Sequence, residues 1–313
     1  MFTQWPSHEG EPSDEKVRTV ASYDPQTGTL LNFGFDLESH LNNDVIEQDG
    51  FLYFMNPEFK NRPEGAPSTV QAQTFYKDFL SCLYGHLSRR LNLVLPGWNE
   101  RGIEFIFSTP RYCTSPNLRR DLEELIKSAG FGAQTKHHVS IVLTEQAILA
   151  TVPLPKIPIP GTVLICDAGG VERHASVCTT STQAGIPLLD IITSTTRQPM
   201  ASESIDYYAK KSMNQRWKSR KGKPDASQII EESTRLEKLI VGNIISARAQ
   251  HGLEVDSIVL SGGLGASGYI QWWIQRDLVG IIEVIVDAEA YTAATRGLVI
   301  HRLRELGFGQ NVE

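Results

Sequence analysis

Residues 162–170 read TVLICDAGG and residues 257–265 read SIVLSGGLG, so an apolar run meets a double glycine twice in this chain. Each run has the β-branched and apolar composition of a buried strand. A glycine turn after such a strand brings backbone N–H groups close to a phosphate or a sugar, because glycine has no side chain in the way. One turn of this kind is weak evidence, but two of them predict a nucleotide that is held by both.

Composition limits the class of protein. The chain has 313 residues, of which 41% are hydrophobic and 21% charged, and its formal net charge is −6. This length predicts two lobes, and the acidic balance argues against a nucleic-acid partner. No apolar stretch is long enough to cross a bilayer and no secretory signal is visible, so we expect a cytoplasmic protein with no membrane partner. The cysteines lack paired spacing and are expected to be reduced, buried thiols with no metal: Cys82, Cys113, Cys166 and Cys178.

Hydrophobic spacing and turn residues predict alternating strands and helices. In the first part we expect a hairpin over 20–35, a helix from Ser68, a strand at 104–107, a helix from Ser115 to Gly130, a strand at 139–143 and a helix from Thr144. In the second we expect a meander of short strands over 174–195, helices at 227–250 and 268–276, a strand at 281–286 and a helix at 289–305. The prolines between 153 and 160 predict a stiff connector, so we place lobe I at 1–160 and lobe II at 161–313. His137 and His138 are expected in a surface turn.

Two sets of residues could contact a nucleotide. Asp167 ends its strand, where a carboxylate could orient a metal-bound water beside a phosphate, although a turn-forming Asp is an equal alternative. Gly262, Gly263 and Gly265 could let a ribose or base lie against the backbone, with the next helix directing its N-terminus at the ligand. The alternative for these glycines is a tight strand-to-helix turn.

Other chemistry is a minor alternative. Residues 263–268 read GLGASG, a formal dinucleotide-binding motif, and Asp287 ends the next strand. Too little chain follows Asp287 to complete a dinucleotide domain. Glu172 and His174 could join Asp167 at a metal, but no further ligand signal supports this, and no metal site is expected.

The order of these elements resembles the actin-like ATPase fold, and most closely the seventy-kilodalton heat-shock proteins of the divergent type common in filamentous fungi. Residues 167–170 resemble the second phosphate loop of that family and residues 258–271 its adenosine loop. Glu145 lies in a segment that resembles the first connecting helix, and Ala293, Ala294 and Gly297 match the small residues of the second.

The resemblance implies an α/β chain with the two-lobe actin-like (ribonuclease-H-like) ATPase fold. It implies ATP or ADP as ligand, with or without Mg, and protein clients or co-chaperones as partners. Asp167 and Glu145 become the candidate catalytic residues. The glycines implied in nucleotide binding are Gly169, Gly170, Gly262, Gly263 and Gly265.

The chain also departs from the family. The first phosphate loop, Asp-x-Gly-Thr-Thr, has no counterpart, so the fold is expected to be incomplete at its N-terminus. Glu172 stands where the family has Thr, His174 where it has Asp, and Leu52 where it has the lysine near the phosphates. We therefore expect a chaperone-like nucleotide-binding protein with a degenerate phosphate site and little or no ATP hydrolysis. The alternative is a pseudo-ATPase that acts as a scaffold and binds no nucleotide.

Overall fold

The chain forms two compact units in the computed structural model. Unit 1 comprises Met1–Phe107 and Cys113–Ile141, and unit 2 comprises Ser108–Tyr112 and Val142–Glu313. The structure describes residues 17, 19–34, 46–48, 51, 54, 67–109, 116–169, 172–183, 186–199, 227–278, 281–287 and 289–308. The proline connector lies within unit 2, and the lobe boundary that we placed there stays a prediction.

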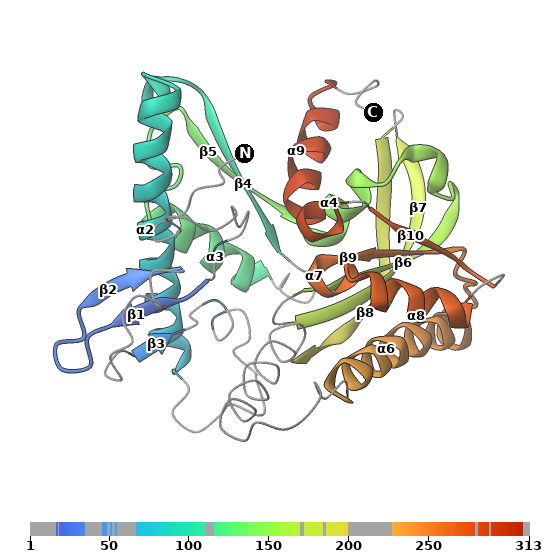
Figure 1. The fold of residues 1–313 in the computed structure, drawn as a ribbon. Helices are drawn as coiled ribbons and strands as arrows, with labels where there is room; N and C mark the ends of the chain where they lie inside the picture. Colours follow the sequence, from blue (N-terminus) through green and yellow to red (C-terminus); the bar gives the residue numbers. More distant parts are fainter. Residues whose placement is uncertain are drawn as a thin grey trace. The chain divides into compact units, whose positions relative to one another are not determined.

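Unit 1 contains a three-stranded antiparallel sheet with a long helix against it (Figure 1). The strands are β1 (Ala21–Tyr23), β2 (Leu30–Phe33) and β3 (Ile46–Gln48), in the order β2-β1-β3. The predicted hairpin is confirmed, and its turn is closed by the Asp24 carboxylate, which accepts hydrogen bonds of 2.8 Å from the N–H groups of Gln26 and Thr27.

Helix α2 (Thr69–Val94) begins where the sequence predicts. Ser68 and Gln71 form a reciprocal capping box, which satisfies two N–H groups at the start of the helix. Aromatic contacts attach the helix to the sheet, since the ring centroids of Tyr23 and Phe75 lie 4.9 Å apart. The Tyr23 hydroxyl also donates a hydrogen bond of 3.0 Å to the Asp78 carboxylate.

A two-stranded sheet is formed by β4 (Ile103–Thr109) and β5 (His137–Leu143). In the sequence, α3 (Pro116–Ser128) lies between these two strands. The prediction of a surface turn at His137 and His138 is wrong, because both residues lie in β5. His137 starts β5, is 4% exposed, and stacks on the Trp98 ring at a centroid distance of 5.1 Å. The imidazole is buried because its flat face packs in an aromatic cluster, a contact that residue spacing cannot reveal.

Unit 2 is built on a five-stranded mixed sheet in the order β10-β9-β6-β7-β8 (Figure 1). The strands are β6 (Gly161–Ala168), β7 (Glu172–Gln183), β8 (Ile186–Pro199), β9 (Ser257–Ser261) and β10 (Glu283–Val286). Strands β6, β9 and β10 are parallel neighbours, whereas β6, β7 and β8 are antiparallel. The predicted meander is instead one long hairpin, because the alternation of side chains continues without a turn residue through Gln183.

Helices cover both faces of this sheet and bury its strands (Figure 1). On one face Leu164, Cys166 and Leu260 pack in a core with residues of α6 (Ser227–His251) and α8 (Gly268–Leu278). On the other face Val163 and Ile165 pack with residues of α4 (Thr144–Thr151), and Ala294 of α9 (Ala293–Glu305) packs against the same core. Burial of each large aliphatic side chain stabilises the fold by about 1.5–3 kcal/mol, so the central strands are rigid supports for the turns that follow them.

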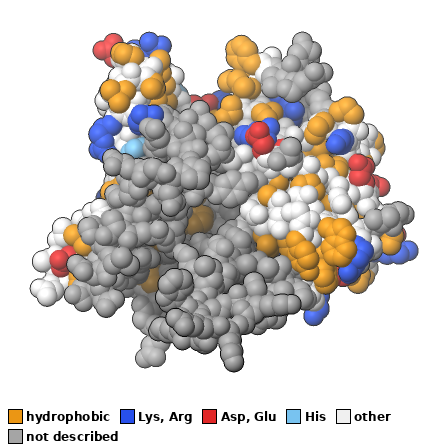
Figure 2. All heavy atoms as spheres, in the orientation of Figure 1, with side chains coloured by type: hydrophobic (Ala, Val, Ile, Leu, Met, Phe, Trp, Pro, Cys, Tyr) orange, Lys and Arg blue, Asp and Glu red, His pale blue; other side chains and the backbone are white. Residues whose placement is uncertain are grey.

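The outer surface of α8 carries exposed aromatic side chains. Tyr269 is 40% and Trp272 55% exposed, and the Arg276 guanidinium lies 4.5 Å from the Trp273 ring centroid. The Trp273 indole N–H donates a hydrogen bond of 3.0 Å to Glu237 of α6. Figure 2 shows the apolar side chains gathered over α8 beside a basic side chain. Among the described residues, no helix has the length and apolar character needed to cross a membrane.

Candidate functional site

The two glycine turns lie against each other in unit 2. Strands β6 and β9 are parallel, and Asp167 is opposite Ser261 in their register. Both turns therefore begin at the same edge of the sheet, at the carboxyl ends of the strands, where α/β proteins bind their ligands. A Cβ atom on Gly262 would lie 2.7 Å from Oδ1 of Asp167, with the Ala168 carbonyl closer still. The φ angle of Gly262 is +86°, so only glycine suits this close approach.

The second turn is a single-turn helix, α7 (Gly262–Gly265), which leads through Ala266 and Ser267 into α8. Leu264 anchors it, since this side chain is 3% exposed in the core beneath. The Ala266 N–H donates to the Gly262 carbonyl at 2.9 Å, and the Gln271 side chain donates to the Gly265 carbonyl at 3.1 Å. The glycine backbone of this turn is thus ordered by one apolar anchor and a small set of hydrogen bonds.

Glu145 lies in the first turn of α4 and is fully buried. Its Oε1 atom accepts a hydrogen bond of 2.9 Å from the Ser176 hydroxyl and lies 3.8 Å from Nε2 of His174. His174 and Ser176 alternate along β7 and therefore share one face of the sheet. The register places Asp167 directly opposite His174, so the three ionisable side chains follow one another on the α4 face. A carboxylate so placed can orient a hydroxyl or a water, but the catalytic role of Glu145 and of Asp167 stays a prediction.

The metal alternative stays a prediction, because it includes Glu172, whose side chain lies outside the description. Within the part of the chain that the structure describes, no group of three or more His, Cys, Asp or Glu side chains could hold a metal ion. His174 Nε2 lies 3.8 Å from Glu145 Oε1, and His174 is opposite Asp167 in the register of β6 and β7. Mg²⁺ could still accompany a nucleotide through the single carboxylate of Asp167, because this ion keeps several waters and needs few protein ligands.

The sequence analysis did not identify a buried arginine beside the first turn as a site residue. Arg173 is 0% exposed and pairs with Ala168 in the register of β6 and β7. Burial raises the pKa of the neighbouring Cys166 thiol to about 12, an effect that Asp167 strengthens and the positive charge of Arg173 weakens. The available signal was that Arg173 occupies a position where the resembling family has an apolar residue. Gly169 is described, whereas Gly170, Leu52 and the side chain of Glu172 lie outside the description.

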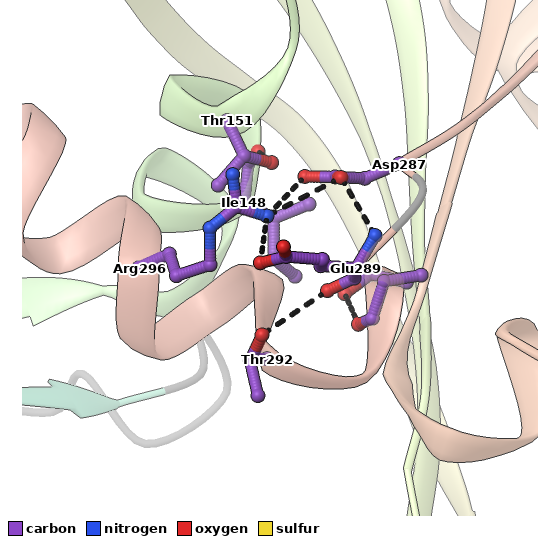
Figure 3. A network of polar contacts seen from close by, with 8 residues as sticks. Ile148, Thr151, Asp287, Glu289, Thr292 and Arg296 are labelled. Atoms are coloured by element: carbon purple, nitrogen blue, oxygen red, sulfur yellow. Dashed lines mark hydrogen bonds and ion pairs between the residues drawn. The ribbon is translucent and has the colours of Figure 1, made fainter. Parts of the chain in front are cut away.

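An ion-pair network lies just after the end of β10 (Figure 3). Nη1 of Arg296 lies 3.2 Å from Asp287 Oδ2 and 3.0 Å from Glu289 Oε2. The Glu289 N–H donates to Asp287 at 2.9 Å. The dinucleotide interpretation needs the Asp287 carboxylate for a ribose, but Arg296 and Glu289 already bond it. This competition argues against that interpretation.

Helix α9, which carries Arg296, approaches α4 at a small residue, Gly297. A Cβ atom on Gly297 would collide with the carbonyl group of Ala147 and lie 3.1 Å from its Cα. Ala293, one turn earlier, is 1% exposed. Ala293 and Gly297, which the resemblance assigned to the second connecting helix, therefore lie where α9 packs closely on α4.

No protein-family model and no curated protein sequence matches the chain. Solved structures do. The crystal structure of MreB5 of Spiroplasma citri bound to ADP matches with a TM-score of 0.59 and 13% identity, over 96% of this chain and 94% of that one. The structure of the same protein bound to AMPPNP matches with a TM-score of 0.58 and 12% identity, over 95% and 93%. The chain therefore has the α/β actin-like ATPase fold, as predicted.

Proposed function

We propose that this chain binds an adenine nucleotide through its second glycine turn and hydrolyses it slowly or not at all. The observation that carries the proposal is the close approach of Gly262 to Asp167, which places both turns at the carboxyl ends of β6 and β9. Support comes from the fold, since the similar MreB5 structures hold ADP and AMPPNP. Gly262, Gly263 and Gly265 would hold the adenosine part, and Gly169 with Gly170 the phosphates.

The phosphate side of this site is expected to be weak. Glu172 brings negative charge where the resembling family has a threonine, and the family's lysine has no counterpart at Leu52. Each hydrogen bond to a charged phosphate stabilises a complex by about 1.5–3 kcal/mol. Loss of two such bonds reduces affinity by about a hundredfold or more. ADP and ATP should therefore bind alike, because the γ-phosphate gains few contacts.

Slow hydrolysis follows from the surroundings of Glu145. A general base must reach the attacking water, but this carboxylate is fully buried and accepts a hydrogen bond from Ser176. We extend the proposal to a chaperone-like, cytoplasmic role with protein clients or co-chaperones. That extension rests on the resemblance of residues 167–170 and 258–271 to the heat-shock proteins.

A scaffold that binds no nucleotide is the second candidate. The observation in its favour is the polar network beside the first turn, where Glu145 already contacts Ser176 and His174. Polar groups that already bond one another leave fewer hydrogen-bonding atoms for a phosphate. Nucleotide-dependent stabilisation separates the two candidates.

The binding test is thermal unfolding with ADP and with ATP. Ligand at a hundred times its Kd stabilises by about 2.7 kcal/mol, which raises the Tm of a chain this size by a few degrees. Gly263→Val should abolish both shifts. Gly242→Val is the matched control, because Gly242 is exposed in α6 and a Cβ there meets nothing within 4 Å. A normal shift in Gly263→Val contradicts the assigned turn, and no shift in the wild-type protein at millimolar nucleotide favours the scaffold.

The hydrolysis test measures phosphate release with Mg²⁺ and ATP. The wild-type protein and Asp167→Ala should release phosphate at the same background rate. Turnover that is well above background and disappears in Asp167→Ala would overturn the proposal of a degenerate site.

A further inference from the structure

Gln271 is the side chain that holds the second glycine turn in place. It is the fourth residue of α8, is half-buried, and its Nε2 atom donates a hydrogen bond of 3.1 Å to the carbonyl of Gly265. Its own N–H donates to the Ser267 carbonyl at 3.0 Å, so the backbone of Gln271 is fixed in α8 while its side chain reaches back to α7.

The turn needs such a support because of its composition. Glycine loses more backbone freedom on ordering than any other residue, and three of the four residues of α7 are glycines. Leu264 fixes the buried side of the turn. The Gly265 carbonyl ends α7, where a helix leaves its last carbonyls without helical partners. Gln271 supplies a donor to this carbonyl.

The position of Gly265 leaves little room for adjustment. A Cβ atom there would lie 3.1 Å from Cγ of Leu260, so the turn packs directly on the end of β9. A hydrogen bond that fixes the Gly265 peptide therefore also fixes the direction of the neighbouring backbone N–H groups. Preorganised donors bind a ligand more tightly, since the ordering cost is met before binding.

We infer that Gln271 is a positioning residue for nucleotide, acting through the Gly265 carbonyl rather than by touching the ligand. This inference rests on the proposed function of the site. Loss of one neutral hydrogen bond should raise the Kd for ADP about three- to tenfold. A carboxylate at this position should do more harm than an apolar side chain, because its oxygen faces the carbonyl oxygen of Gly265.

The experiment titrates ADP calorimetrically into the wild-type protein, Gln271→Met and Gln271→Glu. The matched control is Gln275→Met, because Gln275 is exposed one turn later on the same helix. The Kd should rise in the order wild type, Gln271→Met, Gln271→Glu, with Gln275→Met equal to wild type. A side chain with a merely structural role would lower the Tm and leave the Kd of the folded protein unchanged, and that result overturns the inference.

A second readout needs no nucleotide. In the ligand-free protein, amide hydrogen exchange at Ala266 and Ser267 should be faster in Gln271→Met than in Gln275→Met, because their bonds to the carbonyls of α7 open more often. Equal exchange rates overturn the positioning role even if ADP binds. If the wild-type protein binds no ADP while exchange behaves as expected, the proposed function fails and the nucleotide role of Gln271 fails with it.

Discussion

Gly297→Ala should destabilise the protein, although alanine normally strengthens a helix. Gly297 is buried in α9, and a Cβ there would collide with the backbone carbonyl of Ala147 in α4. The obstacle is main chain rather than the end of a flexible side chain, so two packed helices must move apart. Overpacking costs about 1–3 kcal/mol, and a main-chain obstacle puts this site in the upper part of that range, at about 2–3 kcal/mol. The propensity gain for replacing glycine by alanine is about 1 kcal/mol, so the net loss of stability is about 1–2 kcal/mol.

The matched control is the same substitution in α6. Gly242 is exposed, and a Cβ there meets nothing within 4 Å. Gly242→Ala should therefore show the propensity gain alone, about 0.5–1 kcal/mol of added stability.

Calorimetric or fluorescence-detected unfolding measures both variants. With about 2–4 °C per kcal/mol for a unit of this size, Gly297→Ala should lower the Tm by about 2–8 °C and Gly242→Ala should raise it by about 1–4 °C. Opposite signs for one chemical change are the signature of the close crossing of α4 and α9. Equal stabilisation by both substitutions would refute it.

Two further predictions concern charged and titratable groups. Arg296→Met should lower the Tm by about 1–4 °C, because it removes the partner of Asp287 and Glu289. The control is Arg120→Met, at an exposed ion pair, which should change the Tm little. Equal changes in Tm for the two variants would show that the network adds no stability. Burial raises the pKa of the Cys166 thiol from 9.0 to about 12 and also raises the pKa of Cys178, so mass-spectrometric mapping should find neither thiol alkylated at pH 8 without denaturant and both alkylated in urea. Because the folded-state pKa of Cys166 exceeds its unfolded value, its contribution to stability is complete below about pH 9 and is lost as the pH rises toward 12; rapid alkylation of Cys166 in the native protein would contradict its burial.

The sequence predicted those parts of the fold that depend on local patterns. The helix start at Ser68, the strand before each glycine turn and the helices of unit 2 follow from short-range rules that tertiary packing did not override. The approach of Asp167 to Gly262 could be expected only in outline, from two similar turns.

Long-range packing accounts for what the sequence did not predict. His137 lies beside another histidine in a polar stretch, and only the stack on Trp98 explains its burial. Arg173 is buried in a sheet register that pairs it with Ala168, and no spacing rule predicts a charged residue there. The hydrogen bond from Gln271 to Gly265 joins two helices whose junction was not predicted, since α7 was expected to be part of a turn.

A crystal structure determined after soaking with millimolar ADP tests the central claim most directly. The account predicts density for the adenosine against the backbone of Gly262–Gly265, with the diphosphate extending toward Gly169 at the ends of β6 and β9. Adenosine density at another place on unit 2, or a second glycine turn that stays empty at saturating ADP, would contradict it.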